Sequence, residues 1–222
     1  MAKDANLNLI IDNVKIEQVE HTKFLGVIIN SKLTRQDHIK LVSSNVSKIV
    51  GILSKIRYDL SSEILLMLYR TLVQPYFDYY NIIWATQNNY HLINLHRRQK
   101  KALRIIASVK WDAHTTSLFK KYGVLTIFDT IKLQTCCCVY KAVNNELLDR
   151  FSNLFFMNSD VHHDDARQRS KLHLVAHRLT VGANSIKVYG TKLWNCLINH
   201  ITGSPSYQIF KKIYRKYLLD LM

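Results

Sequence analysis

The residues of this sequence best suited to chemistry are clustered cations. Segment 96–104, HRRQKKALR, places five Lys or Arg within eight positions. Lysine and arginine bind phosphates through charge, and each phosphate that they neutralise releases counterions from the nucleic acid. Apolar residues recur at helical spacing in this stretch, namely Leu92, Leu95, Leu103 and Ile106. The segment therefore predicts a phosphate-contacting helix face, with a merely solvated face as the alternative.

An earlier helix adds two further cations. Apolar residues at spacings of three and four predict it: Ile39, Val42, Val46, Ile49, Leu53 and Ile56. Lys48 and Lys55 are seven positions apart and therefore share a face, with Arg57 close by. Such pairs are usually just solvated, so these lysines gain weight only together with segment 96–104.

The sequence lacks the patterns of a catalytic or metal-binding site. Paired aspartates hold the metal ions of polymerases, but Asp164 and Asp165 lie in a polar stretch without an apolar hairpin, which predicts a surface loop. Gly-rich phosphate loops and a nucleophile elbow are absent from the sequence. The prediction is therefore no catalytic residue.

Three consecutive cysteines, Cys136, Cys137 and Cys138, are a second candidate site. His162 and His163 could complete a zinc set, but the ligand spacing typical of zinc is missing. We therefore expect no metal, and free thiols that act as small apolar residues in a buried helix over 127–143.

The tryptophans Trp84, Trp111 and Trp194 could stack on bases. Aromatic residues at helical spacing are more often part of a core. A core position is therefore predicted for each of the three.

Composition narrows the partners and the fold. The chain has 31 Lys and Arg against 16 Asp and Glu, a net charge of +15, which favours polyanionic partners. No apolar run reaches the ~18 residues that span a bilayer, and the N-terminus lacks the apolar core of a signal peptide. We expect an intracellular protein, nuclear or cytoplasmic and not secreted, that has no membrane partner.

The predicted fold is mainly α with a short N-terminal β-hairpin. Residues 14–19 alternate apolar and polar and 23–30 form a denser apolar run, which predicts two paired strands. Only six Gly and two Pro punctuate the chain, so long helices should follow. They are expected from a Thr34 N-cap onward, and over 62–73, 89–109, 116–122, 127–143, 186–199 and from 207.

Short segments in a fixed order carry a family resemblance. They are HTKFLGV at 21–27, Leu33-Thr34 with His38-Ile39, Leu68-Tyr69 with Gln74-Pro75-Tyr76-Phe77 and Ile83-Trp84, Leu95 with Gln99–Arg104, and Leu193-Trp194-Asn195 with Phe210-Lys211-Lys212. In this order they resemble the C-terminal part of non-LTR, jockey-like (LINE-type) retrotransposon reverse transcriptases. Arg35 stands where the family usually has Trp, and Cys196-Leu197 replaces Leu-Pro.

The resemblance implies a right-hand polymerase cut between palm and thumb. It divides the chain into a residual palm and primer-grip hairpin (1–32), a helical thumb-like bundle (33–150) and a basic helical C-terminal tail (151–222). Phe24, Leu25 and Gly26 would support a primer terminus. The family's catalytic aspartates and their Mg²⁺ belong to the palm, so no cofactor is expected here and these residues alone should be inactive.

The resemblance also implies the partner. Thumb helices of the family lie along the template–primer duplex and touch phosphates, so an RNA–DNA hybrid or another nucleic acid is expected. The binding residues would be Lys48, Lys55, Arg97, Arg98, Lys100, Lys101 and Arg104. Two alternatives stay open: a non-catalytic helical protein-interaction module with a basic surface, and a subunit that complements a separate palm-containing polypeptide.

Overall fold

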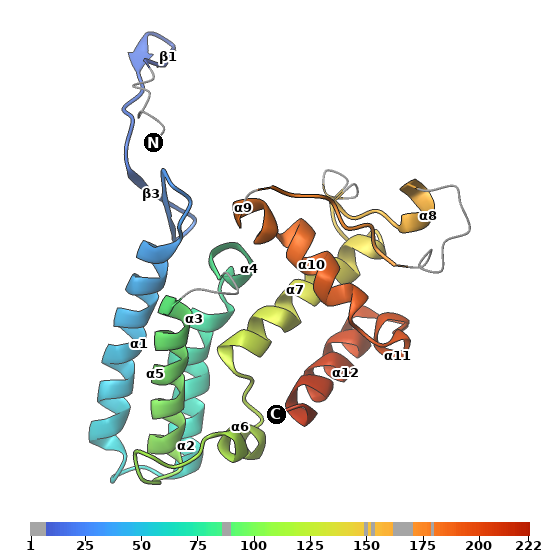
Figure 1. The fold of residues 1–222 in the computed structure, drawn as a ribbon. Helices are drawn as coiled ribbons and strands as arrows, with labels where there is room; N and C mark the ends of the chain where they lie inside the picture. Colours follow the sequence, from blue (N-terminus) through green and yellow to red (C-terminus); the bar gives the residue numbers. More distant parts are fainter. Residues whose placement is uncertain (1–7, 86–89, 149–150, 152–153, 162–170, 179) are drawn as a thin grey trace.

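The computed structural model describes residues 8–85, 90–148, 151, 154–161, 171–178 and 180–222, and they are mostly helical. Helices α1 (Gln36–Ile56), α2 (Ser62–Leu68) and α5 (Tyr90–Ile106) lie side by side at one end (Figure 1). Helices α10 (Ile186–Asn195), α11 (Asn199–Thr202) and α12 (Tyr207–Asp220) form the other end, and α7 (Ile127–Val143) lies between the two groups. The predicted mainly α fold is confirmed.

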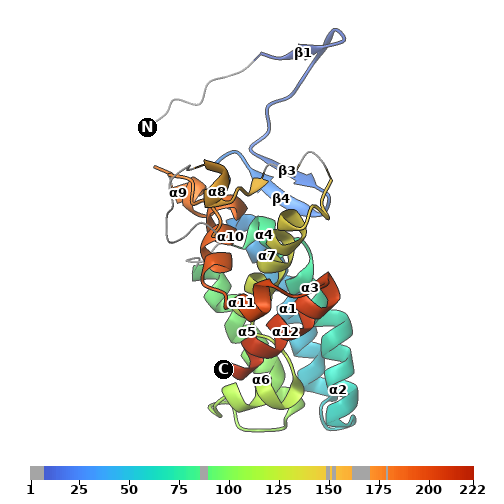
Figure 2. The ribbon, with the colours of Figure 1, turned by 90° about the vertical axis from the view of Figure 1, so that its right-hand side faces the viewer.

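Two hairpins, and not one, precede the helices. They pair β1 (Ile10–Ile11) with β2 (Val14–Lys15), and β3 (His21–Phe24) with β4 (Val27–Asn30). The first hairpin extends away from the helices in both views (Figures 1 and 2). The predicted pairing of 14–19 with 23–30 is therefore wrong. Leu25 and Gly26 have φ of 44° and 80°, and two left-handed residues in a row make a tight turn inside the run read as one strand.

The start of α1 also differs from the prediction. Arg35, with φ of 58°, precedes the helix without a side-chain cap. The hydroxyl of Thr34 instead accepts a hydrogen bond from Asn30 Nδ2 at 2.7 Å, so Thr34 belongs to the β4–α1 connection. The apolar face is as expected: Ile39, Val42, Val46 and Leu53 are buried.

A π-helix interrupts the second helical segment. Ser61 caps α2, and the helix continues through η1 (Tyr69–Val73) into α3 (Gln74–Asp78). Pro75 has no N–H and its ring crowds the preceding turn, so a regular α-helix cannot run through this point. The widened turn keeps the segment helical, and α4 (Asn81–Trp84) follows.

Helix α7 takes part in two hydrophobic clusters. Ile127 and Ile131 belong to the cluster that also holds the buried residues of α1, α2 and α5, whereas Val139 and Tyr140 belong to the cluster formed with α10 and α12. Its bounds agree with the prediction, as do those of α6 (Thr116–Tyr122) and the start of α12. The expected helix over 186–199 is shorter in the structure: α10 ends at Asn195, and the separate helix α11 begins at Asn199. Two short helices, α8 (Asn158–Val161) and α9 (Thr180–Ala183), complete the fold.

The cysteines and tryptophans are mostly in the core. Cys136 and Cys137 are buried free thiols, and burial raises the pKa of Cys136 to about 12, so it stays protonated near neutral pH. Trp84 and Trp194 are buried as predicted. Trp111 is 86% exposed, so its predicted core position is wrong. It follows α5, in a turn segment where helical spacing no longer applies.

Membrane-spanning helices and metal-ligand clusters can be looked for only among the described residues. Among the described residues no helix has the length and apolar character to cross a bilayer, and no three His, Cys, Asp or Glu side chains cluster as metal ligands would. The loop prediction for Asp164 and Asp165, and the paired histidines beside them, lie outside the described residues.

A buried amide links the helices around α5. Gln99 is fully buried, and its Nε2 donates to Tyr69 Oη (3.0 Å) and to the Leu125 carbonyl (2.9 Å). Its Oε1 accepts from the Ile127 backbone N–H at 3.0 Å. One side chain thus joins α5 to η1 and to the beginning of α7.

Replacing Gln99 by Met, which has a similar shape, should destabilise the protein by about 3 kcal/mol, because buried polar groups are left unpaired at about 1–3 kcal/mol each. Urea unfolding followed by circular dichroism would measure the change. Gln208→Met, at an exposed position of α12, is the matched control. Equal unfolding free energies for the two variants would contradict the role of Gln99.

Two helical glycines should respond oppositely to alanine. A Cβ on Gly190 would lie 2.9 Å from Val139 Cγ2, where α10 meets α7, whereas a Cβ on Gly51 would meet nothing within 4 Å. Gly51→Ala should therefore stabilise by about 0.5–1 kcal/mol through helix propensity. Gly190→Ala should destabilise by about 1–3 kcal/mol through overpacking. Thermal unfolding of both variants checks this, and a gain for Gly190→Ala would show that α10 can move away without cost.

Candidate nucleic-acid interface

The cations of α5 meet α1 along a seam. The two helices run in the same direction (Figure 1). Serines of α1 line the seam beside Arg98 of α5. Two hollows lie along the seam. The hollow near the helix starts, of about 400 Å³, is lined by Ile39, Lys40, Ser43, Ser44, Ser47, His91, Asn94 and Arg98.

The second hollow lies near the helix ends. It has a volume of about 290 Å³ and is lined by Ser54, Arg57, Lys101, Arg104, Ile105, Val109 and Trp111. We call the residues lining the two hollows the α1–α5 seam.

Arg98 is fastened to α1. Its Nε donates to the Ser43 carbonyl at 3.1 Å and to Ser47 Oγ. These bonds orient the guanidinium across the seam, and the described hydrogen bonds use Nε alone. Arg98 thus holds the two helices together and still presents charge to the first hollow.

Arg104 organises the second hollow. Its Nε donates to the Ala113 carbonyl at 2.9 Å, which holds the segment after α5 against the helix. Trp111 belongs to that segment and exposes most of its ring beside the arginines. Arg57 lies with its guanidinium carbon 4.5 Å from the centre of the Tyr58 ring, and its Nε is buried without a hydrogen-bond partner among the described residues. Cations and an exposed indole therefore share one hollow.

The charge along the seam has one sign. Five cations line the two hollows, namely Lys40, Arg57, Arg98, Lys101 and Arg104, and none of the described lining residues is acidic. The carboxylate of Asp37 lies 3.7 Å from Lys40 Nζ, in an exposed i, i+3 pair that solvent screens. The α1–α5 seam therefore attracts anions, because few acidic side chains neutralise its positive charge.

The predicted binding residues do not form one face. Arg98, Lys101 and Arg104 line the seam, whereas Lys48, Lys55 and Arg97 lie on exposed outer surfaces of α1 and α5. Lys100 lies one turn after His96, on a third flank of α5, where the His96 ring contacts Phe119 of α6 and Phe128 of α7. Burial lowers the pKa of His96, and the Lys100 charge adds to this, whereas the Gln99 hydrogen bond and the Asp129 charge oppose it. A helix turns 100° per residue, so a dense run of cations is necessarily divided among several directions.

The sequence reasoning missed part of the seam. Lys40, Arg57 and Trp111 were not among the predicted binding residues, nor were the serines beside them. The signal was present, since Ser43, Ser47 and Ser54 recur at helical spacing beside the apolar face of α1. Nothing local indicated that this flank would face α5.

The hairpin turn with the predicted primer-grip residues lies at the start of α1. Tyr79 Oη donates to the Leu25 carbonyl at 2.9 Å, and the side chains of Phe24 and Leu25 are exposed. His38 accepts a hydrogen bond from the Ile28 N–H at 3.3 Å, and burial lowers its pKa, which keeps it a neutral acceptor. The turn is thus held from both α1 and α3, with an apolar tip toward solvent.

Comparison with known proteins gives a relative. Over 125 residues the chain is 28% identical to a protein described as a probable RNA-directed DNA polymerase from transposon X-element of Drosophila melanogaster. The match covers 54% of this chain but 14% of that protein. No protein-family model and no solved structure matches the chain. The similarity supports a reverse-transcriptase-like relationship.

Proposed function

We propose that this chain is the thumb and tail part of a non-LTR, jockey-like RNA-directed DNA polymerase, and that its α1–α5 seam contacts the phosphate backbone of a template–primer duplex. The observation that carries this proposal is the single-sign charge of the seam together with its serine hydroxyls. Lys, Arg and Ser are the side chains that most often bind nucleic-acid phosphates.

The length of the seam suits a duplex. Lys40 and Arg57 are 17 residues apart along α1, which corresponds to about 25 Å at 1.5 Å per residue. One strand of B-form DNA advances about 3.4 Å per nucleotide along its axis, and an A-form-like hybrid advances less, so the seam could follow about seven nucleotides or slightly more. Contacts of this kind position a duplex without reading its sequence.

In this function the described chain binds nucleic acid and supplies no catalytic residue and no metal ligand. Mg²⁺ and its aspartates would belong to a palm, in the same or a separate polypeptide. Phe24, Leu25 and Gly26 would then lie near the primer terminus, and the exposed apolar turn is compatible with that position.

Neutralising the seam should weaken nucleic-acid binding. Lys40→Gln with Lys101→Gln removes two exposed cations from the two hollows, and Lys212→Gln with Lys216→Gln removes two exposed cations from α12. For an RNA–DNA hybrid, the slope of log affinity against log salt should fall by about 1.8 in the seam variant, and the affinity should fall roughly tenfold. Fluorescence anisotropy between 25 and 200 mM salt would measure both.

Two results would overturn the proposal. One is equal affinity of the seam variant and the α12 control. The other is binding to an acidic polypeptide but not to nucleic acid at equal salt, which would favour the helical protein-interaction module. A separate palm-containing polypeptide, if supplied, should extend primers faster with the wild-type chain than with the seam variant.

A further inference from the structure

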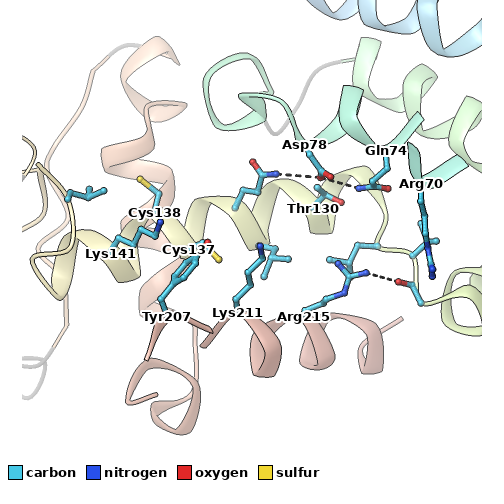
Figure 3. Close-up of a pocket in the computed structure, with 16 residues that line it drawn as sticks. Arg70, Gln74, Asp78, Thr130, Cys137, Cys138, Lys141, Tyr207, Lys211 and Arg215 are labelled. Atoms are coloured by element: carbon cyan, nitrogen blue, oxygen red, sulfur yellow. Dashed lines mark hydrogen bonds between the residues drawn. The ribbon is translucent and has the colours of Figure 1, made fainter. Parts of the chain in front are cut away.

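A second cationic cleft lies away from the seam, between α3, α7 and α12 (Figure 3). Its volume is about 670 Å³. Three helical segments line it, mostly with residues three or four apart: Arg70, Gln74 and Asp78 from η1 and α3; Thr130, Gln134, Cys138 and Lys141 from α7, with Cys137 next to Cys138; Tyr207, Lys211 and Arg215 from α12. Since i and i+4 share a helix face, each segment presents one stripe to the cleft.

Four cations surround this space. Arg70 donates to the Tyr122 carbonyl at 2.9 Å, and Arg215 donates to the Gly123 carbonyl at 2.8 Å. Each bond uses one of the five N–H groups of a guanidinium, so the arginines are oriented while most of their donors remain. Lys211 points into the cleft from α12 in Figure 3, and Lys141 Nζ lies 4.2 Å from the centre of the Tyr207 ring.

The positive charge is only partly compensated. Asp78 is the acid among the lining residues, and it accepts hydrogen bonds from Gln74 (3.1 Å) and Gln134 (3.4 Å). Burial raises the pKa of Asp78, although the Gln74 hydrogen bond and the charges of Arg215 and Lys211 oppose this. Among the described residues, no carboxylate oxygen lies within 4.0 Å of a side-chain nitrogen of the four cations.

We propose that this cleft binds a nucleotide-sized phosphorylated ligand, with its phosphates between Arg70, Lys211 and Arg215. The volume is in the range of small-ligand sites, about 300–1,000 Å³. A duplex would need a broad surface, whereas the cations here converge from three sides on one concave space. Arginine suits this ligand because its fork binds two phosphate oxygens at once.

The proposal does not rest on the seam, because the two sites share no residue. The same phosphate chemistry could come from a free nucleoside triphosphate or from the phosphorylated end of a single strand. If the ligand is a free nucleoside triphosphate, the cleft should bind the triphosphate alone. If the ligand is a strand end, the cleft should bind a single strand more tightly when the strand carries a terminal phosphate.

The test compares two pairs of lysines, one that lines the cleft from α7 and α12 and one on the neighbouring face of α12. Lys141→Gln with Lys211→Gln alters the cleft, and Lys212→Gln with Lys216→Gln removes the same charge beside it. Calorimetry with deoxythymidine triphosphate in EDTA, and anisotropy with penta-thymidylate with or without a 5′-phosphate, provide the two arms. Unchanged circular dichroism and unfolding temperature would confirm that each variant folds.

The wild-type chain should bind at least one phosphorylated probe, the cleft variant at least tenfold more weakly, and the α12 control and the seam variant like the wild type. Absence of binding by all four proteins would overturn the proposal. Equal binding by the cleft variant and the control would also overturn it, since it would reflect general charge attraction.

Discussion

The position of Gln99 governs how the two ends of this protein meet. Its amide satisfies a tyrosine hydroxyl, a carbonyl and an N–H that would otherwise be buried unpaired, and these groups come from η1 and from the start of α7. Because unpaired buried groups are costly, α7 has little freedom to begin elsewhere. Both hydrophobic clusters then form along α7, so its placement decides where α10 and α12 pack.

The same helices create two cationic surfaces of different shape. The α1–α5 seam is long, shallow and lined by serines, and it suits an extended phosphate backbone. The cleft between α3, α7 and α12 is concave and receives cations from three directions, which suits a compact anion. Arg98, Arg70 and Arg215 each donate a hydrogen bond to a backbone carbonyl. Because these bonds already orient the arginines in the folded protein, less conformational entropy is lost when they bind an anion.

Sequence patterns predicted helix bounds best where clear end signals flank the apolar residues. Helix α6, helix α7 and the start of α12 agree with the prediction because clear end signals flank them: Gly123 has φ of 59° after α6, and the side chains of Thr126 and Ser206 cap α7 and α12. The predicted strand pairing was wrong where a short apolar run could pair with more than one neighbouring segment. The apolar run over 23–30 predicts one strand, but its centre is a two-residue turn, because Leu25 and Gly26 adopt positive φ. The frequent core position of aromatic residues at helical spacing predicts a buried Trp111, but Trp111 lies in a turn segment after α5 and is exposed.

The sequence by itself determined the mainly helical class, the buried thiols of α7, and an excess of positive charge that predicts a polyanionic partner. It also carried the ordered motifs behind the reverse-transcriptase resemblance. Only the tertiary structure decided which cations act together. Helical periodicity divides 97–104 among three directions, while Arg70, Lys141 and Arg215 converge although they are far apart in the chain. Spacing along a helix specifies a face, but the surface that this face meets depends on packing between distant segments.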